Sequence, residues 1–188
     1  MSVLDITIRL TLATIISGLI GFDREYKNRP AGIRTHILVC VGATIIALIQ
    51  TQVHIESIAL ASENLDLLSV VSSDRTRLVA QVVSGIGFLG AGTIIVNKKS
   101  VSGLTTAASL WASACLGIAI GMGYYAITFV GSVAIIGVLS ILHRFLKVPT
   151  QKKLEIQYIH RIETKSVIND YFESRDITVA DVDFRVEK

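Results

Sequence analysis

Residues 104–121 read LTTAASLWASACLGIAIG, eighteen residues without a charged side chain. At a rise of about 1.5 Å per residue, a helix of about 20 apolar residues crosses the roughly 30 Å hydrocarbon core of a bilayer. Other stretches share this character, and the first of them contains only Asp5 and Arg9 as charged residues. The sequence therefore predicts about five transmembrane helices, at 3–22, 35–51, 79–96, 104–121 and 124–142.

The composition of the whole chain agrees with this prediction. Charged residues make up 18% of the 188 residues and hydrophobic residues 51%, whereas a soluble domain carries about 25% charged residues. The mean hydropathy is +0.59. So many apolar helices leave no amphipathic helices to cover them in water, which excludes a uniform soluble globule. We predict an all-α polytopic membrane bundle over residues 1–148 and a polar tail over residues 149–188.

The charges between the predicted helices indicate an orientation, because Lys and Arg accumulate in cytoplasmic loops. Basic residues follow the first, third and fifth predicted spans, whereas acidic residues outnumber basic ones in the stretch 52–78. The basic residues are Arg24, Lys27, Arg29 and Arg34, then Lys98 and Lys99, then Arg144, Lys147, Lys152 and Lys153. We therefore predict the N-terminus outside and the C-terminal tail in the cytoplasm. The net charge of +3 reflects this topology and does not indicate nucleic-acid binding.

The third predicted span contains the glycine pattern of a dinucleotide site, at Gly85, Gly87 and Gly90. That site needs a preceding strand and an acidic residue about 20 positions further on, but Leu110 occupies that position. Close helix packing is the better interpretation, because small residues let backbones approach in lipid. The alternative is a broken helix whose freed carbonyls line a polar cavity. The predicted packing glycines are Gly85, Gly87, Gly90 and Gly92, joined by Ala13, Ser17 and Gly21 in the first span and by Ser113, Gly117 and Gly121 in the fourth.

Charged residues near the ends of the predicted spans are candidate functional residues, because ionisable groups in a membrane are costly. Asp5 and Arg9 are four residues apart on one helical face and could pair. They form either a structural pair at the membrane surface or a site in an outer vestibule. Asp23, Arg24, Glu25 and Arg34 cluster at the inner ends of the first two spans. They form either an ion-pair clamp across the cytoplasmic mouth or simple interfacial anchors.

Uncharged polar residues in the third and fourth spans are the remaining candidates for a polar cavity. They are Gln81, Ser84, Thr105, Ser109 and Trp111. Ser and Thr can bond the carbonyl four residues earlier in their own helix and then need no other partner. The amide of Gln81 and the indole N–H of Trp111 need partners from another helix or from water.

The sequence lacks the motifs of several functional classes. No His/Cys spacing indicates a zinc or copper site, no catalytic motif is present, and a P-loop is absent. We therefore predict a protein that is not an enzyme and that has no cofactor and no resident metal.

The polar tail alternates apolar and polar residues at Leu154, Ile156 and Tyr158 and again at Val182, Phe184 and Val186, which is typical of strands. Between these stretches, apolar residues fall on one face of a short helix. They are Val167, Ile168, Tyr171 and Phe172. The tail is thus predicted to be a strand–helix–strand unit, half of a ferredoxin-like fold. So small a unit buries too little core to be stable alone. We therefore expect either a homodimer in which two tails complete a shared sheet, or a tail that is shortened in this sequence.

Four sequence blocks within about residues 4–125 resemble the MgtC/SapB family of bacterial inner-membrane proteins. They are GLIGFDRE at 18–25, AGIRTH at 31–36, SGIGFLGAGTI at 84–94 and GLTTAASLW at 103–111. The family usually has Glu where Asp23 stands, and some relatives have Asn at the position of Thr105 and Cys at that of Ala112. A role that needs that amide or thiol therefore does not transfer to this chain.

The resemblance implies a bacterial inner-membrane protein linked to growth under magnesium limitation and, in pathogens, to survival in host cells. Longer members of the family carry a small ACT-like domain where the polar tail begins, a domain that commonly binds small ligands or pairs with itself. The first functional hypothesis is a non-enzymatic regulator or adaptor that acts on another membrane protein complex in magnesium or acid stress. The alternative is a transporter or channel for Mg²⁺ or another small cation or solute, along the polar face of the third and fourth spans.

Overall fold

The computed structural model describes residues 1–63, 76–97, 100–142, 156 and 161–175. The chain divides into two compact units, Met1–Leu146 and Lys147–Lys188. Within its described residues, the first unit contains five α-helices, a short hairpin and a π-helical turn. Its elements are α1 (Val3–Tyr26), α2 (Ile33–Glu63), α3 (Arg77–Ala91), β1 (Ile95–Asn97), β2 (Ser100–Ser102), α4 (Leu104–Gly121), α5 (Tyr125–Ile136) and η2 (Gly137–Leu142). The second unit contains α7 (Arg161–Ser174).

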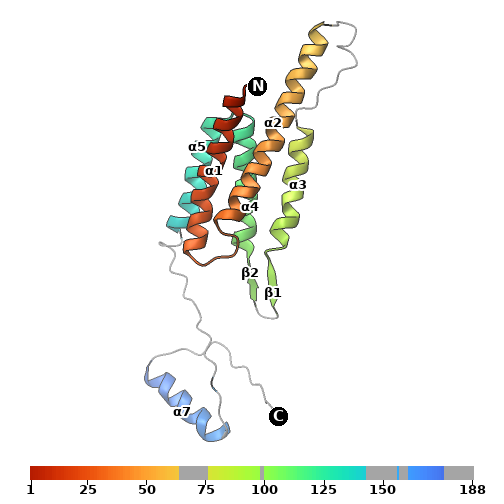
Figure 1. The fold of residues 1–188 in the computed structure, drawn as a ribbon. Helices are drawn as coiled ribbons and strands as arrows, with labels where there is room; N and C mark the ends of the chain where they lie inside the picture. The colour runs from red at the N-terminus through yellow and green to blue at the C-terminus, as the bar shows by residue number, and fades with distance from the viewer. Residues whose placement is uncertain (64–75, 98–99, 143–155, 157–160, 176–188) are drawn as a thin grey trace. The chain divides into compact units, whose positions relative to one another are not determined.

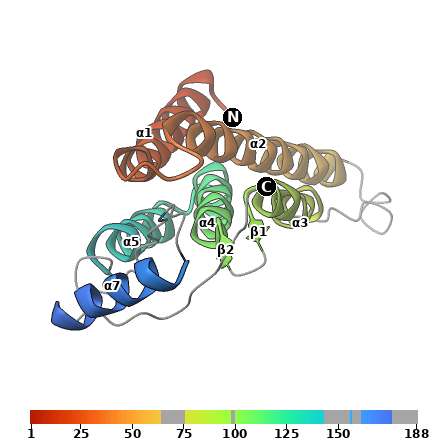
Figure 2. The same ribbon diagram turned by 90° about the horizontal axis from the view of Figure 1, so that it is seen from below.

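Successive helices of the first unit run in alternating directions, so the α1–α2 turn, the β1–β2 hairpin and the end of α5 lie at the same end (Figure 1). Seen along the bundle, α4 is central, with α2 on one side and α3 and α5 flanking it (Figure 2). Helix α4 packs against α1, α2, α3 and α5. The alternation has the up-and-down arrangement that the sequence predicts.

The reversal between α1 and α2 takes six residues around Pro30, as a proline at a helix boundary predicts. Asn28 and Ala31 adopt positive φ angles of 51° and 55°, which turn the chain sharply. Glu25 then caps the new helix, because its carboxylate accepts a hydrogen bond of 2.9 Å from the Ile33 amide. The turn thus fixes the start of α2 beside the end of α1.

Small residues bring the backbones of α1, α2 and α4 into close contact, which confirms the packing predicted for the first and fourth spans. A Cβ atom on Gly21 would lie 2.6 Å from the Ile33 Cα, and one on Gly121 would lie 2.6 Å from the carbonyl oxygen of Thr44. A Cβ atom on Gly117 would overlap the carbonyl oxygen of Cys40. At Gly117 and Gly121, the contact between α2 and α4, called the seam below, is therefore filled by backbone atoms and has no space for larger side chains.

Three of the described helices are long and apolar enough to cross a membrane, namely Val3–Tyr26, Ile33–Ser62 and Leu104–Gly121. Helices α3 and α5 are apolar but shorter, so the count of five spans stays a prediction. Helix α2, with 31 residues, is longer than the predicted 35–51. Its extension occupies part of the stretch 52–78 between the second and third predicted spans. At 1.5 Å per residue the whole helix is about 46 Å long.

The third predicted span, 79–96, is wrong at its end. Helix α3 ends at Ala91, and Ile95 instead pairs with Ser102 in an antiparallel hairpin. The glycine-rich end of α3 weakens the helix, and the β-branched run after Gly92 favours a strand. Hydropathy alone cannot separate an apolar strand from the last turn of an apolar helix.

In the second unit, α7 covers the predicted helical residues 167–172. Ile168 and Phe172 are half-buried, whereas Val167 and Tyr171 are exposed. The two strands predicted beside this helix lie outside the described residues, apart from Ile156, which is exposed and in neither a helix nor a strand. The half-ferredoxin arrangement of the tail therefore stays a prediction.

Candidate functional site

A buried arginine is the centre of the candidate site. Arg24 lies in the last turn of α1 and is only 5% exposed. Its Nη2 donates a hydrogen bond of 2.5 Å to Oγ1 of Thr106, a fully buried residue in the first turn of α4. The Nε of Arg24 is buried and has no hydrogen-bond partner. A permanent positive charge is thus enclosed where α1 meets α4.

A buried histidine continues this polar network from α4 into α2. Nε2 of His36 lies 3.0 Å from Oγ of Ser109, and Nδ1 lies 3.0 Å from the carbonyl oxygen of Gly32. A carbonyl can only accept, so Nδ1 carries the proton in the neutral ring and Nε2 accepts from Ser109. Oγ of Ser109 also lies 2.9 Å from the carbonyl oxygen of Thr106, an alternative acceptor for the same hydroxyl proton. The network therefore joins all three helices at one end of the bundle.

Further along the same seam, buried hydroxyls satisfy backbone carbonyls. Thr44 lies within hydrogen-bond distance of the carbonyl oxygens of Cys40, at 2.8 Å, and Gly117, at 3.0 Å. Ser17 donates to the carbonyl oxygen of Ala13 at 2.5 Å. The hydroxyl of Ser113 is buried without a partner. Polar groups thus line the contact of α1, α2 and α4 over several turns.

Asp23, which the sequence groups with Arg24, points to a different element. Its carboxylate accepts hydrogen bonds from Lys27 at 2.9 Å and from Ser140 of η2 at 2.7 Å. Lys27 also donates to the carbonyl oxygen of Leu139 at 2.7 Å. Asp23 therefore ties α1 to the π-helical turn and is not the counter-ion of Arg24.

The proposed clamp of Asp23, Arg24, Glu25 and Arg34 does not form as one ion-pair cluster. Asp23 pairs with Lys27, Arg24 bonds to Thr106 and Glu25 caps α2. Arg34 is exposed. Only Arg24 joins the buried network.

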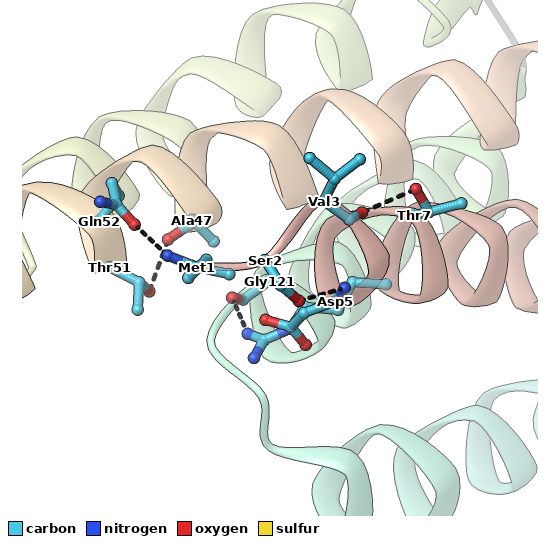
Figure 3. A network of polar contacts seen from close by, with 10 residues as sticks. Met1, Ser2, Val3, Asp5, Thr7, Ala47, Thr51, Gln52 and Gly121 are labelled. Carbon is cyan, nitrogen blue, oxygen red and sulfur yellow. Dashed lines mark hydrogen bonds and ion pairs between the residues drawn. The ribbon is translucent and has the colours of Figure 1, made fainter.

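The opposite end of the bundle carries the predicted pair of Asp5 and Arg9. Nε of Arg9 lies 3.0 Å from the Asp5 carboxylate, and Nη1 donates to the carbonyl oxygen of Gly121 at 2.7 Å. Figure 3 shows Asp5 and Gly121 side by side, with the Met1 amino group reaching Gln52 of α2, at 3.0 Å. The pairing is confirmed, and the pair ties the start of α1 to the end of α4.

The structure places the other candidates away from the network. Gln81 and Ser84 of α3 and Thr105 of α4 are exposed, and Trp111 is 48% exposed. Only Ser109 of the predicted cavity residues on spans three and four belongs to the buried network. The two helices meet instead at Gly90, where a Cβ atom would lie 3.4 Å from that of Ala107.

The remaining glycines of α3 have different surroundings from Gly90. A Cβ atom on Gly85 or Gly87 would meet no atom within 4 Å, and one on Gly92 would meet only carbonyl oxygens of its own helix. Close helix packing at these three glycines therefore stays a prediction. It would need a second copy of the chain or another protein to pack against them.

Sequence reasoning missed His36 and Thr106. Thr106, Ser109 and Ser113 recur at three- and four-residue steps, which marks one face of a helix. That periodicity signals a polar face on α4, but it does not identify the residues of α1 and α2 that meet it.

Comparison with known proteins gives a consistent result. A family model described as the MgtC family matches residues 10–148. "Putative magnesium transporter YhiD" of Escherichia coli K12 is 37% identical over 140 residues, which cover 74% of this chain and 61% of that protein. "Protein MgtC" of Brucella abortus is 40% identical over 151 residues, 79% of this chain and 54% of the relative.

"Protein SapB" of Bacillus subtilis is 38% identical over 122 residues, 64% of this chain and 49% of the relative. The chain thus spans between about half and three fifths of the length of these relatives. No solved structure matches.

Proposed function

We propose, from the premise that this chain belongs to the MgtC family of membrane proteins, that it is a non-enzymatic regulator linked to magnesium limitation. It acts on another membrane protein complex of the bacterial inner membrane in magnesium or acid stress, or during infection. The name of the YhiD relative supports the link to magnesium. The regulatory role is argued from the buried polar network around Arg24.

The observation that carries the proposal is the buried guanidinium of Arg24, bonded to Thr106 where α1, α2 and α4 meet. A magnesium ion keeps much of its water and prefers carboxylate and phosphate oxygens. At an effective dielectric constant of about 20, a divalent cation about 5 Å from a guanidinium is repelled by roughly 7 kcal/mol. The interior at this end of the bundle therefore disfavours a magnesium path and favours a packed regulatory element.

The same bundle supports a specific topology. The basic loop after α1 and the hairpin between α3 and α4 lie at the end of the bundle where α5 ends (Figure 1). Because basic loops face the cytoplasm, we propose five spans with the N-terminus outside and the C-terminal tail inside. The tail then pairs two copies in a homodimer, and the bilayer surrounds the helices.

Transport of Mg²⁺ or another small cation is the second candidate, and the name of the YhiD relative favours it. The proposed path follows the polar face of α3 and α4. Gln81, Ser84 and Thr105 are exposed on the single chain, so such a path needs a second copy or another protein to enclose it.

Growth and flux measured together test the proposal. A strain that lacks its own copy of this protein is grown in low magnesium with the wild-type chain or with Arg24→Gln, Gln81→Ala or the control Arg77→Gln. The wild-type chain and Arg77→Gln should restore growth and Arg24→Gln should not, with no magnesium flux from any of them in liposomes. Restored growth with Arg24→Gln, or flux that Gln81→Ala abolishes, would favour transport.

A further inference from the structure

Among the three described helices that are long enough to cross a membrane, α1, α2 and α4, only α4 begins without a hydrogen bond to a capping side chain. The first turn of any helix leaves backbone N–H groups without partners inside that helix. In α1 the hydroxyl of Ser2 accepts from the Asp5 amide at 3.2 Å, and in α2 the carboxylate of Glu25 accepts from Ile33. Helix α4 begins after Gly103, which makes no side-chain cap, and a Cβ atom there would overlap the carbonyl oxygen of Thr93.

A second, independent feature lies at the same place. The buried Nε of Arg24 has no hydrogen-bond partner, although its Nη2 is held by Thr106, the third residue of α4. Arg24 makes no ion pair within the part of the chain that the structure describes. The neighbouring carboxylates are engaged elsewhere, Asp23 by Lys27 and Ser140 and Glu25 by α2. A buried charge without a partner is strongly destabilising.

Together these features form a cationic, donor-rich site. The positive end of the α4 dipole, the uncapped amides of its first turn and the Arg24 guanidinium all favour a negative charge. Helix α2 also starts here, and its His36 is hydrogen-bonded to Ser109 of α4. An anion at this place would find its hydrogen-bond donors in the unpartnered Nε of Arg24, the first-turn amides of α4 and the Thr106 hydroxyl.

We propose that a phosphate-type oxyanion binds between Arg24 and the first turn of α4. A tetrahedral phosphate presents oxygens in several directions, so it can accept from a guanidinium and from helix amides together. The group is either inorganic phosphate or the headgroup of an anionic phospholipid, and binding involves no covalent step. If the chain is the regulator proposed above, this oxyanion is the signal to which it responds. Binding of the oxyanion itself does not depend on the regulatory role.

Equilibrium dialysis of the full chain in a non-ionic, phosphate-free detergent tests the free form, with radiolabelled inorganic phosphate as the probe. Retention of phosphatidylglycerol, measured by native mass spectrometry after reconstitution and re-extraction, tests the lipid form. The variants are Arg24→Gln and Thr106→Val. The control is Arg77→Gln, which removes one exposed charge at the start of α3, the opposite end of the bundle (Figure 1).

Wild type and Arg77→Gln should bind one of the two probes alike, and Arg24→Gln should bind it about tenfold more weakly or worse, the effect of losing a charge-assisted hydrogen bond. Thr106→Val should weaken binding severalfold, and it keeps the proposal testable if Arg24→Gln fails to fold by circular dichroism. Phosphate binding identifies the free ion, and phosphatidylglycerol retention identifies the lipid.

Two results would overturn the proposal. One is that the wild-type chain binds neither phosphate nor phosphatidylglycerol. The other is that Thr106→Val binds as tightly as Arg77→Gln does. Neither result bears on magnesium flux, so failure of this site and failure of the proposed function are separable.

Discussion

The guanidinium of Arg24 lies 2.5 Å from the hydroxyl of Thr106, a residue 82 positions further along the chain. This bond joins the end of α1 to the start of α4. It gives a buried positive charge a single hydrogen-bonded protein partner among the described residues. We expect the stability of the bundle to depend on this contact, and the proposed role rests on it.

Thr106→Val removes the hydroxyl and keeps the shape of the side chain. Because it deprives a buried charge of its hydrogen bond, we expect the free energy of unfolding to fall by about 1–3 kcal/mol. Unfolding by sodium dodecyl sulfate in mixed micelles measures it. Thr105→Val, at an exposed neighbour, is the control and should change stability by less than about 0.5 kcal/mol. Equal effects of the two variants would show that the Arg24–Thr106 bond contributes nothing.

The glycines of α4 and α3 should respond differently to alanine. Gly117→Ala places a methyl group against the Cys40 carbonyl, and such overpacking destabilises by about 1–3 kcal/mol. Gly87→Ala meets no atom of this chain within 4 Å and should not lower the stability of the monomer, and it could raise it by up to about 1 kcal/mol because alanine favours a helix over glycine. A strong loss of monomer stability with Gly87→Ala and none with Gly117→Ala would contradict the described packing.

Gly87→Leu tests whether the open glycine face of α3 packs against a second copy. If it does, the larger side chain should separate the copies while each copy keeps its fold. Chemical crosslinking in membranes measures the dimer, and circular dichroism measures the fold. A normal dimer with Gly87→Leu would rule out close packing at that face.

Asp23 should contribute modestly, because its pair with Lys27 is partly exposed, with side-chain exposures of 18% and 27%. Asp23→Asn should lower stability by roughly 0.5–1 kcal/mol, as partly solvated pairs do. Amide hydrogen exchange in η2 should increase, because the hydrogen bond from Ser140 to residue 23 weakens when the carboxylate loses its charge. Ser140→Ala provides the comparison, and unchanged exchange in both variants would contradict the tie between α1 and η2.

The orientation is testable by labelling. In a chain with Cys40 and Cys115 replaced by alanine, a single cysteine is placed at Asn28 or at Tyr124, both exposed residues in turns. A membrane-impermeant maleimide added to whole cells should label the Tyr124 position and not the Asn28 position, because the basic turn faces the cytoplasm. The reverse pattern would place the N-terminus inside.

Much of the bundle could be predicted from the sequence because hydropathy and helical period are local signals. The apolar segments form helices, and the small residues of α1 and α4 lie at close contacts between helices. The prediction failed at Ile95 and Val96, because apolar β-branched residues suit a strand as well as a membrane helix. The end of the helix was decided there by hairpin pairing, which local hydropathy does not report.

The site was harder to predict, because its contacts join residues far apart in the sequence. Arg24 and Ser109 were among the candidates, but their partners Thr106 and His36 were not. A polar residue on a helix indicates that it needs a partner, and the partner is set by which helices pack together. Gln81 is a strongly polar residue that the sequence predicts to need a partner, but it lies exposed on α3, outside the buried network.

Magnesium flux through the wild-type chain is the most direct test of the proposal that this protein is a regulator with no ion path of its own. The purified protein is reconstituted in liposomes that contain a magnesium-sensitive dye, and Arg24→Gln is measured beside it. We expect both to match protein-free liposomes, since removing the charge does not open the backbone seam at Gly117 and Gly121. Saturable magnesium entry through the wild-type chain would contradict the account.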